Sequence, residues 1–219
     1  MLSKKSLEHL RKEIESTSNP FTFYDDDPDG LTSYLLLKKR FEQVSGTIIK
    51  GAPALEEKYA QMVQEQNPDK VIILDKPMVE KGFFEGVKRP IIWVDHHDPQ
   101  SPPKNVEYFN PRIKKKSDRS PTSYIMYKAL GGPLWLAMIG VVGDWYIAPE
   151  MKKLQKEKPN LLPTIASPPK VLFETEFGRL IKVISFLLKQ RTSDVNNSVK
   201  DLLKITEPEE ILDQKTPEG

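Results

Sequence analysis

Short apolar runs alternate with longer amphipathic segments through the first half of the chain. Val71–Leu74 and Ile91–Val94 are uninterrupted apolar runs, which are typical of strands buried on both faces of a parallel sheet. Phe21–Tyr24 and Gly46–Lys50 also have the composition of strands. These four segments are predicted to form the core sheet.

The segments that flank these strands have helical periodicity. Apolar residues recur at gaps of three and four in segments 3–16, 31–44 and 54–66, as in a helix with one buried face. The alternation of strands and helices predicts an α/β fold, with a parallel β-sheet flanked by helices on both faces.

Additional C-terminal helices are predicted after residue 120. Segments 120–130 and 193–204 read as helices, and segment 133–142 is apolar all round, which predicts a buried helix. A long helix is predicted from its apolar stripe, formed by Phe177, Leu180, Ile181, Ile184, Leu187 and Leu188. The tail from Glu207 is predicted to be a linker.

Acidic residues and histidines follow three of the predicted strands. They are the cluster Asp25–Asp29, the single Asp75, and Asp95–His97; Asp144 follows the buried helix. Because ligands bind at the carboxyl ends of parallel strands, these side chains are expected to converge. Neighbouring carboxylates repel by on the order of 1 kcal/mol per pair even in water, so a pinned cluster of this kind favours a bound cation.

Each of these residues also has an ordinary structural explanation when taken alone. The aspartates after Tyr24 suit a solvated turn, Asp75 suits a helix cap, and two adjacent histidines suit a surface loop. The spacing from Asp25 to Gly30 matches half of an EF-hand loop, but Leu36 stands where that loop needs a glutamate. Oxygen ligands at strand ends therefore favour catalytic Mn²⁺ or Mg²⁺.

Composition narrows the class of protein. The 219 residues carry 33 basic and 31 acidic side chains, so no global basic field exists for coating nucleic acid. The absence of cysteine excludes disulfides and thiolate metal sites. The longest apolar run, Pro133–Gly143, is far shorter than the ~20 residues of a membrane span. A soluble, cytoplasmic protein without membrane association is predicted.

The ordered motifs resemble those of the DHH phosphoesterase superfamily, over about residues 20 to 150. The resemblance rests on four motifs in order, namely Asp25-x-Asp27-x-Asp29-Gly30, Asp75, Asp95-His96-His97 and Gly143-Asp144. The segments Asn110–Arg112 and Pro121–Ser123 resemble secondary signatures of its RecJ-like branch. The superfamily includes single-strand exonucleases, phosphodiesterases of short and cyclic dinucleotides, exopolyphosphatases and manganese pyrophosphatases.

The resemblance implies two Mn²⁺ ions, with Mg²⁺ as a substitute. The implied ligands are Asp25, Asp27, Asp29, Asp75, His96 and Asp144, with Asp75 as the implied bridge between the ions. The resemblance further implies that His97 contacts the scissile phosphate and that Asp95 orients a histidine from outside the metal ligands. Some branches begin the first motif with histidine instead of Asp25, so the division of ligands between the two ions stays open.

The implied activity is metal-dependent hydrolysis of phosphodiester bonds in single-stranded DNA or RNA, or in short linear or cyclic nucleotides. Two divalent ions neutralise the phosphate and activate a water. Asn110, Arg112 and Lys114 are predicted to bind substrate, the arginine by a bidentate fork. Pyrophosphate or polyphosphate hydrolysis is the alternative within the superfamily, and a non-catalytic replication scaffold is the alternative outside enzymes.

The domain organisation is predicted from the same resemblance. Residues 1–190 would form the catalytic domain, and residues 191–219 would be a helical linker or tail toward a C-terminal substrate-binding domain. No glycine-rich motif of such a domain follows residue 190. Substrate binding is therefore expected to involve a further domain or an oligomeric partner.

Overall fold

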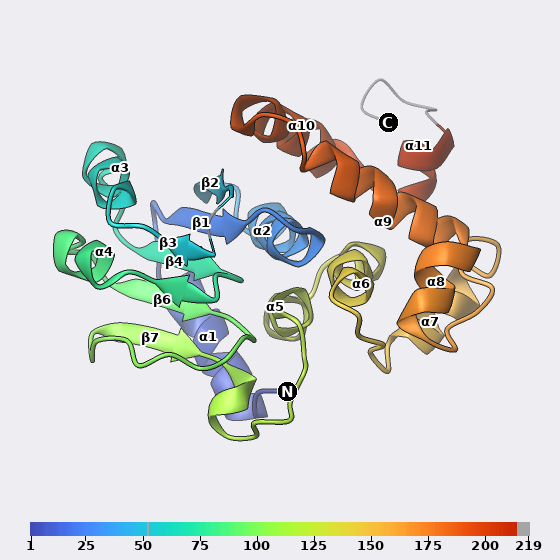
Figure 1. Ribbon diagram of the computed structural model, residues 1–219, viewed down its shortest axis with the longest axis horizontal. Helices are drawn as coiled ribbons and strands as arrows, with labels where there is room; N and C mark the ends of the chain where they lie inside the picture. The colour runs from blue at the N-terminus through green and yellow to red at the C-terminus, as the bar shows by residue number, and fades with distance from the viewer. Residues whose placement is uncertain (52, 214–219) are drawn as a thin grey trace.

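A five-stranded parallel sheet forms the core of the computed structural model, which describes residues 1–51 and 53–213 (Figure 1). Its strand order is β2-β1-β4-β6-β7. The strands are β1 (Phe21–Asp25), β2 (Ser45–Ile49), β4 (Val71–Leu74), β6 (Ile91–Val94) and β7 (Val106–Phe109). All four neighbouring pairs are parallel, as predicted.

The direction in which the sheet grows reverses between β1 and β4. The chain passes from β1 outward to β2, and then returns to add β4, β6 and β7 on the other side of β1. In open parallel sheets this reversal leaves a crevice beyond the carboxyl ends of the two central strands, where ligands bind. The topology alone therefore places the residues after Tyr24 and Leu74 at the same crevice.

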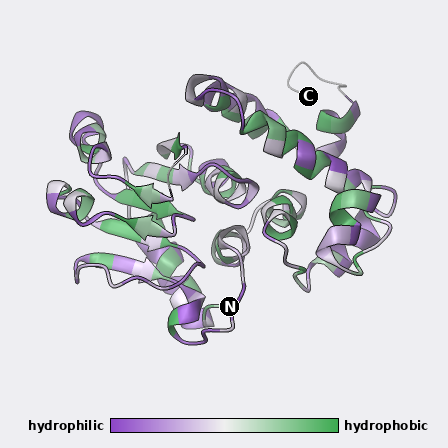
Figure 2. Ribbon diagram, viewed as in Figure 1, coloured by the Kyte–Doolittle hydropathy of each residue, from purple (hydrophilic) through white to green (hydrophobic). Residues whose placement is uncertain are grey.

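Helices cover both faces of the sheet, which confirms the predicted fold class. Along β4, Val71 and Ile73 pack toward α3 (Tyr59–Gln66) and α4 (Lys81–Gly86). Ile72 and Leu74 belong to the core on the other face. That face is covered by α1 (Lys4–Glu15) and α2 (Pro28–Arg40). Figure 2 shows hydrophobic residues concentrated in the central strands, and a mixture of hydrophobic and hydrophilic residues along the helices.

The elements of the structure differ from the predicted ones in three respects. Residues expected to open a helix at Ala54 instead form β3 (Ala54–Leu55), which pairs with β5 (Met78–Val79) in a small parallel sheet. Helix α2 begins at Pro28, inside the acidic cluster, and is buried on all sides over residues 29–37 rather than on one face. Strand β7 and helix α4 lie in segments for which no element was predicted.

The C-terminal half is helical. The helices are α5 (Thr122–Leu130), α6 (Leu134–Gly143), α7 (Met151–Glu157), α8 (Pro168–Glu174), α9 (Glu176–Leu187), α10 (Thr192–Lys204) and α11 (Pro208–Asp213), with a short 3-10 helix, η1 (Pro111–Ile113). Helices α5, α6, α9 and α10 contact α2, and Figure 1 shows them together on one side of the sheet. The predicted stripe through Phe177, Ile181 and Leu188 is buried in the main core. Within the described residues, no helix has the length and apolar character needed to cross a membrane.

The predicted linker is partly ordered. Residues 208–213 form α11, whose Ile211 is buried against the main core, and residues 214–219 lie outside the described residues. In the preceding α10, Val195, Val199 and Leu202 are buried in the same core. Whether residues 191–219 lead toward a further domain stays a prediction.

Candidate active site

The acidic cluster spans the turn from β1 into α2. Asp27 is the N-cap of α2, and its Oδ1 accepts a hydrogen bond of 2.8 Å from the amide of Gly30. Proline at the first helical position and an aspartate cap are both favoured at helix starts. Asp25 ends β1, where its Oδ1 accepts a hydrogen bond of 2.7 Å from Nζ of the fully buried Lys76. The cluster is thus divided between two different environments.

Asp29 is held by the first turn of α5. Its Oδ2 accepts a 2.7 Å hydrogen bond from the amide of Thr122, and its Oδ1 accepts a 2.9 Å bond from the amide of Ser123. Free amides and the helix dipole stabilise an anion at a helix N-terminus. Asp29 is almost fully buried, so these two donors fix the orientation of its carboxylate.

Asp75 lies directly beyond β4 and is completely buried. Its backbone is left-handed, with φ of +62°, a conformation that aspartate visits more readily than most residues. Its Oδ1 accepts a 2.8 Å hydrogen bond from Oγ1 of Thr122, and its Oδ2 is buried without a hydrogen-bond partner. One oxygen is therefore positioned by α5, and the other is left for a ligand.

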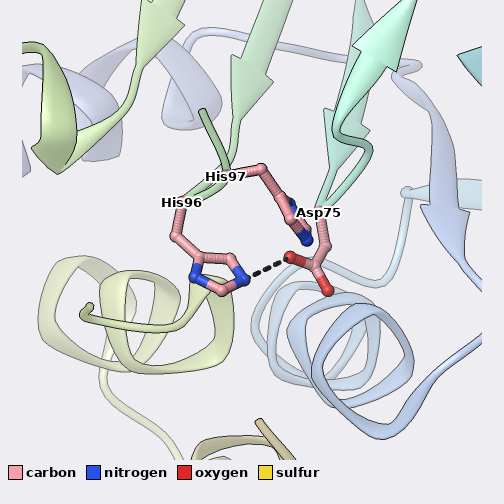
Figure 3. A group of neighbouring side chains, drawn as sticks. All are labelled: Asp75, His96 and His97. Atoms are coloured by element: carbon pink, nitrogen blue, oxygen red, sulfur yellow. Dashed lines mark ion pairs between the residues drawn. The ribbon is translucent and has the colours of Figure 1, made fainter. Parts of the chain in front are cut away.

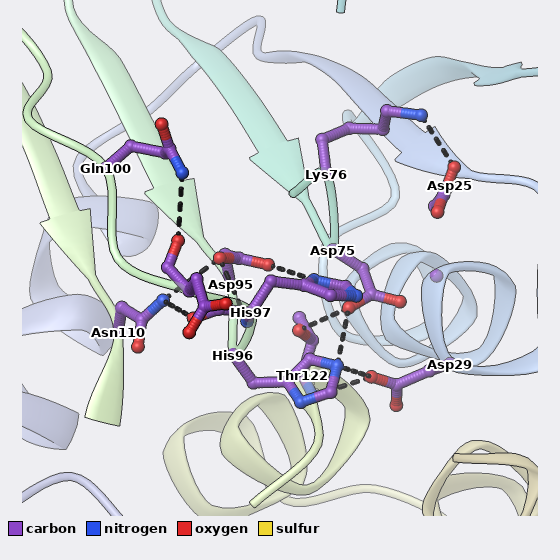
Figure 4. Close-up of polar contacts among 12 residues, drawn as sticks. Asp25, Asp29, Asp75, Lys76, Asp95, His96, His97, Gln100, Asn110 and Thr122 are labelled. Carbon is purple, nitrogen blue, oxygen red and sulfur yellow. Dashed lines mark hydrogen bonds and ion pairs between the residues drawn. The ribbon is translucent and has the colours of Figure 1, made fainter. Parts of the chain in front are cut away.

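The side chain of His96 reaches into the centre of these carboxylates. Its Nε2 lies 3.4 Å from Oδ1 of Asp75 (Figure 3) and 3.8 Å from Oδ2 of Asp29 (Figure 4). It also lies 3.4 Å from Oδ2 of Asp144. This nitrogen is buried and has no hydrogen-bond partner. Burial lowers the pKa of His96 although Asp29 raises it, so the ring is neutral near pH 7 and offers a lone pair.

His97 is oriented by a separate polar network. Its Nδ1 lies 2.7 Å from Oδ1 of the buried Asp95. Oδ2 of Asp95 accepts hydrogen bonds from the amide of His97 and from Nδ2 of Asn110 (Figure 4). The hydroxyl of Tyr108 donates to the same oxygen. Burial would lower the pKa of His97, but the hydrogen bond and charge of Asp95 reverse this, and the pKa is raised.

The carboxyl groups of the cluster destabilise one another's ionised forms. Burial and the charge of Asp29 raise the pKa of Asp27 to about 6. Burial together with Asp29 and Asp27 raises the pKa of Asp144 to about 8 and that of Asp75 well above its usual range. Asp144 also caps the C-terminus of α6, where the helix dipole disfavours a negative charge. A bound cation would remove each of these penalties.

Two overlapping groups of side chains have the composition of a divalent-metal site. One contains Asp75, His96 and His97, and the other contains Asp29, His96 and Asp144; within each group, one ligand atom per residue lies within 4.8 Å of the others. The unpartnered Nε2 of His96 and Oδ2 of Asp75 fit a metal ion, because a bound cation would satisfy both atoms. Neutral imidazole with carboxylate oxygens suits Mn²⁺.

A cavity of about 450 Å³ opens beside this group. It is lined by His96, His97, Arg112, Arg119, Asp144, Trp145 and Tyr146. Nη2 of Arg112 is held 2.6 Å from Oδ1 of Asp98. Arg112 also borders a second cavity, of about 700 Å³, together with Lys116 and Tyr108. Arginine side chains thus line the cavity beside the acidic centre.

The structure brings most of the predicted site residues together. Asp29, Asp75, His96 and Asp144 meet at the crevice, with Asp27 in the adjoining turn and His97 and Asp95 at its edge. The remaining predicted residues lie differently. Asp25 faces Lys76 (Figure 4), Asn110 is buried where it supports Asp95 and His97, and Lys114 is exposed and outside the cavity lining.

Sequence reasoning did not identify Lys76, Thr122 and Trp145 as site residues. Lys76 follows Asp75 directly, and a lysine beside a strand-end aspartate was an available signal. Thr122 lies in a segment that was predicted to be a helix and that resembles a family signature, but its own contacts were not predicted. Trp145 follows Asp144, but nothing in the sequence shows that its ring lies at the cavity.

Comparison with solved structures shows that the chain has the DHH fold of RecJ-type proteins. It matches RecJ from Thermus thermophilus in complex with Mn²⁺ with a TM-score of 0.62 and 15% identity, over 93% of this chain and 38% of that chain. It matches an exonuclease RecJ bound to manganese with a TM-score of 0.58 and 18% identity, over 93% of this chain and 66% of that one.

A third solved structure is the DHH domain of a protein from a family of ribosomal proteins. The TM-score is 0.63 at 18% identity, over 96% of this chain and 57% of that chain. No protein-family model and no curated protein sequence matches this chain. The chain spans less than two thirds of the length of each of these three structures, and at such low identity the likeness concerns the fold.

Proposed function

We propose that this chain is a divalent-metal-dependent phosphoesterase that hydrolyses phosphodiester bonds, with Mn²⁺ as the preferred ion and Mg²⁺ as a substitute. The observation that carries the proposal is the pair of unpartnered buried atoms, Nε2 of His96 and Oδ2 of Asp75, among converging carboxylates. A buried polar atom without a partner costs about 1–3 kcal/mol. A cation bound between these side chains would relieve that cost for both atoms.

The residues that would hold the metal are Asp27, Asp29, Asp75, His96 and Asp144. A role of Asp25 as a ligand stays a prediction, since its carboxylate faces Lys76. When bound, two divalent ions would neutralise the phosphate charge and supply an activated water. The hydrogen bonds from α5 to Asp29 and Asp75 hold these ligands in place before the ions bind.

His97 is the residue we propose to act on the substrate phosphate. Asp95 fixes the Nδ1 side of its ring, which leaves the other nitrogen for the cavity that His97 lines. The raised pKa of His97 favours the protonated form, which can donate a hydrogen bond to a phosphate oxygen or a proton to the leaving oxygen. Arg112, held by Asp98, would contact a neighbouring phosphate.

We propose single-stranded DNA or RNA, or short linear or cyclic nucleotides, as the substrate class. The manganese-bound RecJ structures with the same fold support a phosphodiester substrate. Substrate contacts by Asn110 and Lys114, the cytoplasmic location, and a contribution from a further domain or an oligomeric partner stay predictions.

A hydrolysis panel tests the proposal. The full chain with Mn²⁺ should cleave single-stranded oligonucleotides or dinucleotides, and chelation should abolish this activity. Asp75→Asn should lower the rate by at least about 100-fold, in keeping with the loss of a metal ligand's charge from a two-metal centre. The matched control is Asp201→Asn, because Asp201 is half-exposed on α10 and pairs with Lys204.

The panel also includes pyrophosphate and polyphosphate. Cleavage of these compounds without any cleavage of phosphodiesters would assign the alternative activity of the superfamily. Complete inactivity of the wild-type chain toward every substrate, with every divalent ion, would support the scaffold alternative. Equal activity of the Asp75→Asn variant and the wild type would show that Asp75 is not a metal ligand needed for hydrolysis.

A further inference from the structure

Trp145 is a large aromatic residue that is exposed to solvent beside the candidate active site. It follows Asp144 directly and lines the same cavity as His97, Arg112 and Arg119. The residue is 61% exposed, whereas the two other tryptophans, Trp93 and Trp135, are 0% and 6% exposed. The protein therefore presents one tryptophan to solvent, and presents it at this cavity.

The backbone at Trp145 is one that glycine would normally occupy. Helix α6 ends in a Schellman motif, in which the amide of Tyr146 donates to the carbonyl of Val141 and the amide of Trp145 donates to the carbonyl of Val142, both at 3.0 Å. Trp145 takes the left-handed position of this motif, with φ of +58°. That position is most often glycine, and a bulky side chain there is strained.

Folding does not account for a tryptophan at this position. The ring gains little from burial because most of it remains exposed, and the left-handed backbone opposes any residue with a Cβ atom. Strained residues that the fold does not need are found preferentially where a ligand uses them. Trp145 lines a cavity that two arginines also line, and these neighbours indicate what that ligand contains.

An exposed indole can bind the base of a nucleotide, and nearby arginines can bind its phosphate. Nucleobases stack on aromatic rings with little dependence on sequence, since every base has a π-face. Arginine forks bind phosphate oxygens. Arg112 and Arg119 lie on the cavity that Trp145 also lines, so one nucleotide can contact the ring through its base and a guanidinium through its phosphate.

We propose that Trp145 is the stacking platform for a nucleobase of the substrate, and that it makes the site specific for phosphodiesters that carry a base next to the cleaved phosphate. This inference rests on the proposed phosphoesterase function and narrows its substrate class. Pyrophosphate and polyphosphate have no group to occupy the ring, so Trp145 contributes nothing to their binding.

Binding of a mononucleotide tests the proposal without any turnover. In Mg²⁺ buffer, adenosine 5′-monophosphate should quench the fluorescence of the full chain saturably, because Trp145 is the exposed fluorophore and Trp93 and Trp135 are buried. Ribose 5-phosphate, which has the same charge and sugar but no base, should cause no quenching at the same concentration. Equal effects of the two compounds would overturn the proposal.

Trp145→Gly separates binding from folding. Glycine suits the left-handed backbone, so the variant should melt no lower than the wild type. Its affinity for adenosine 5′-monophosphate, measured by calorimetry, should fall about ten-fold or more, while Trp145→Phe should stay within a few-fold of wild type. The matched control is Phe186→Ala, which removes an exposed aromatic on α9 outside the cavity and should leave the affinity unchanged. An unchanged affinity in Trp145→Gly would show that the ring serves another purpose, such as contact with a protein partner.

The outcomes also separate this proposal from the proposed function. Metal-dependent hydrolysis of oligonucleotides that is unaffected by Trp145→Gly would overturn only the stacking role. Base-dependent binding through Trp145, in a chain that hydrolyses nothing, would overturn the phosphoesterase function and keep the nucleotide site.

Discussion

The buried pair of Lys76 and Asp25 separates one predicted ligand from the rest of the acidic cluster. Nζ of Lys76 lies 2.7 Å from Oδ1 of Asp25, and the lysine is fully buried. Burial raises the pKa of Asp25, and the charge of Lys76 offsets part of that rise. At the scale of single residues, one carboxylate that was predicted to be a metal ligand is therefore paired with a buried ammonium group.

Removal of this ammonium should destabilise the fold strongly. Lys76→Met leaves the carboxylate of Asp25 without its charged partner, and breaking a buried ion pair from one side costs about 3–5 kcal/mol. Urea unfolding should show this loss, and the double variant Lys76→Met with Asp25→Asn should recover part of it. Lys70→Met is the matched control, because the pair of Lys70 and Glu13 is more exposed and should cost at most about 1 kcal/mol. A Lys76→Met loss no larger than that of the control would show that the pair contributes little.

At the scale of elements, the site is assembled from helix ends. The start of α2 supplies Asp27 and Asp29, the first turn of α5 supplies the donors that hold Asp29, and the end of α6 supplies Asp144. These ends can meet only if α6 approaches α2 and α5 closely. Gly140 permits this approach, since a Cβ there would lie 2.4 Å from Oγ1 of Thr32 and 2.5 Å from Oγ of Ser123.

Gly140→Ala should therefore damage the fold and the site together. The added methyl would also lie 2.9 Å from Oδ1 of Asp29, so α6 must shift and carry Asp144 with it. Overpacking of this kind costs about 1–3 kcal/mol, and we expect weaker Mn²⁺ binding by calorimetry as well. Gly143→Ala in the same helix is a milder comparison, because its nearest contact would be 3.0 Å from Pro28. Equal stability of Gly140→Ala and wild type would show that the three helices adjust freely.

The elements also show what the sequence could predict. Strands β4 and β6 are apolar without interruption, so their burial on both faces was predictable. The convergence of the acidic residues that follow these strands was predictable from the parallel sheet. Strand β7 was missed because it is an edge strand with an exposed centre, beside a segment rich in proline and lysine. The pairing of Asp25 with Lys76 depends on how two adjacent strands end, and the exposure of Trp145 depends on how α6 ends. Neither this pairing nor this exposure could be predicted from the periodicity of the sequence.

At the scale of the whole molecule, the topology concentrates negative charge at one crevice. The switch of strand order between β1 and β4 brings Asp27, Asp29 and Asp75 together, and α6 adds Asp144. The fold thereby accepts a cost in the metal-free protein, because buried carboxyls with raised pKa values must ionise as the pH rises. The free energy of unfolding of the entire chain should therefore depend on the pH through the carboxyl groups of this site.

The sign of this effect follows from the pKa shifts. Burial and neighbouring charge raise the pKa of Asp27 to about 6 and that of Asp144 to about 8 in the folded chain, while unfolded aspartate titrates near pH 3.9. The folded state therefore binds more protons than the unfolded state between about pH 4 and pH 8, so stability falls as the pH rises through this window. His97, whose pKa is also raised, acts in the same direction, and His96, whose pKa is lowered, opposes it.

Metal binding should reverse this trend. The metal-free chain should melt several degrees lower at pH 8 than at pH 5, when melting is followed by circular dichroism in the presence of a chelator. Saturating Mn²⁺ should raise the melting temperature by an amount that grows with pH, because the ligands must be deprotonated and the ion binds only the folded state. Asp75→Asn, which removes one buried like charge, should melt higher than wild type at pH 8 without metal and should gain less from Mn²⁺. A metal-free melting temperature that stays constant or rises between pH 5 and pH 8 would contradict the assignment of buried, mutually repelling carboxyls at the crevice.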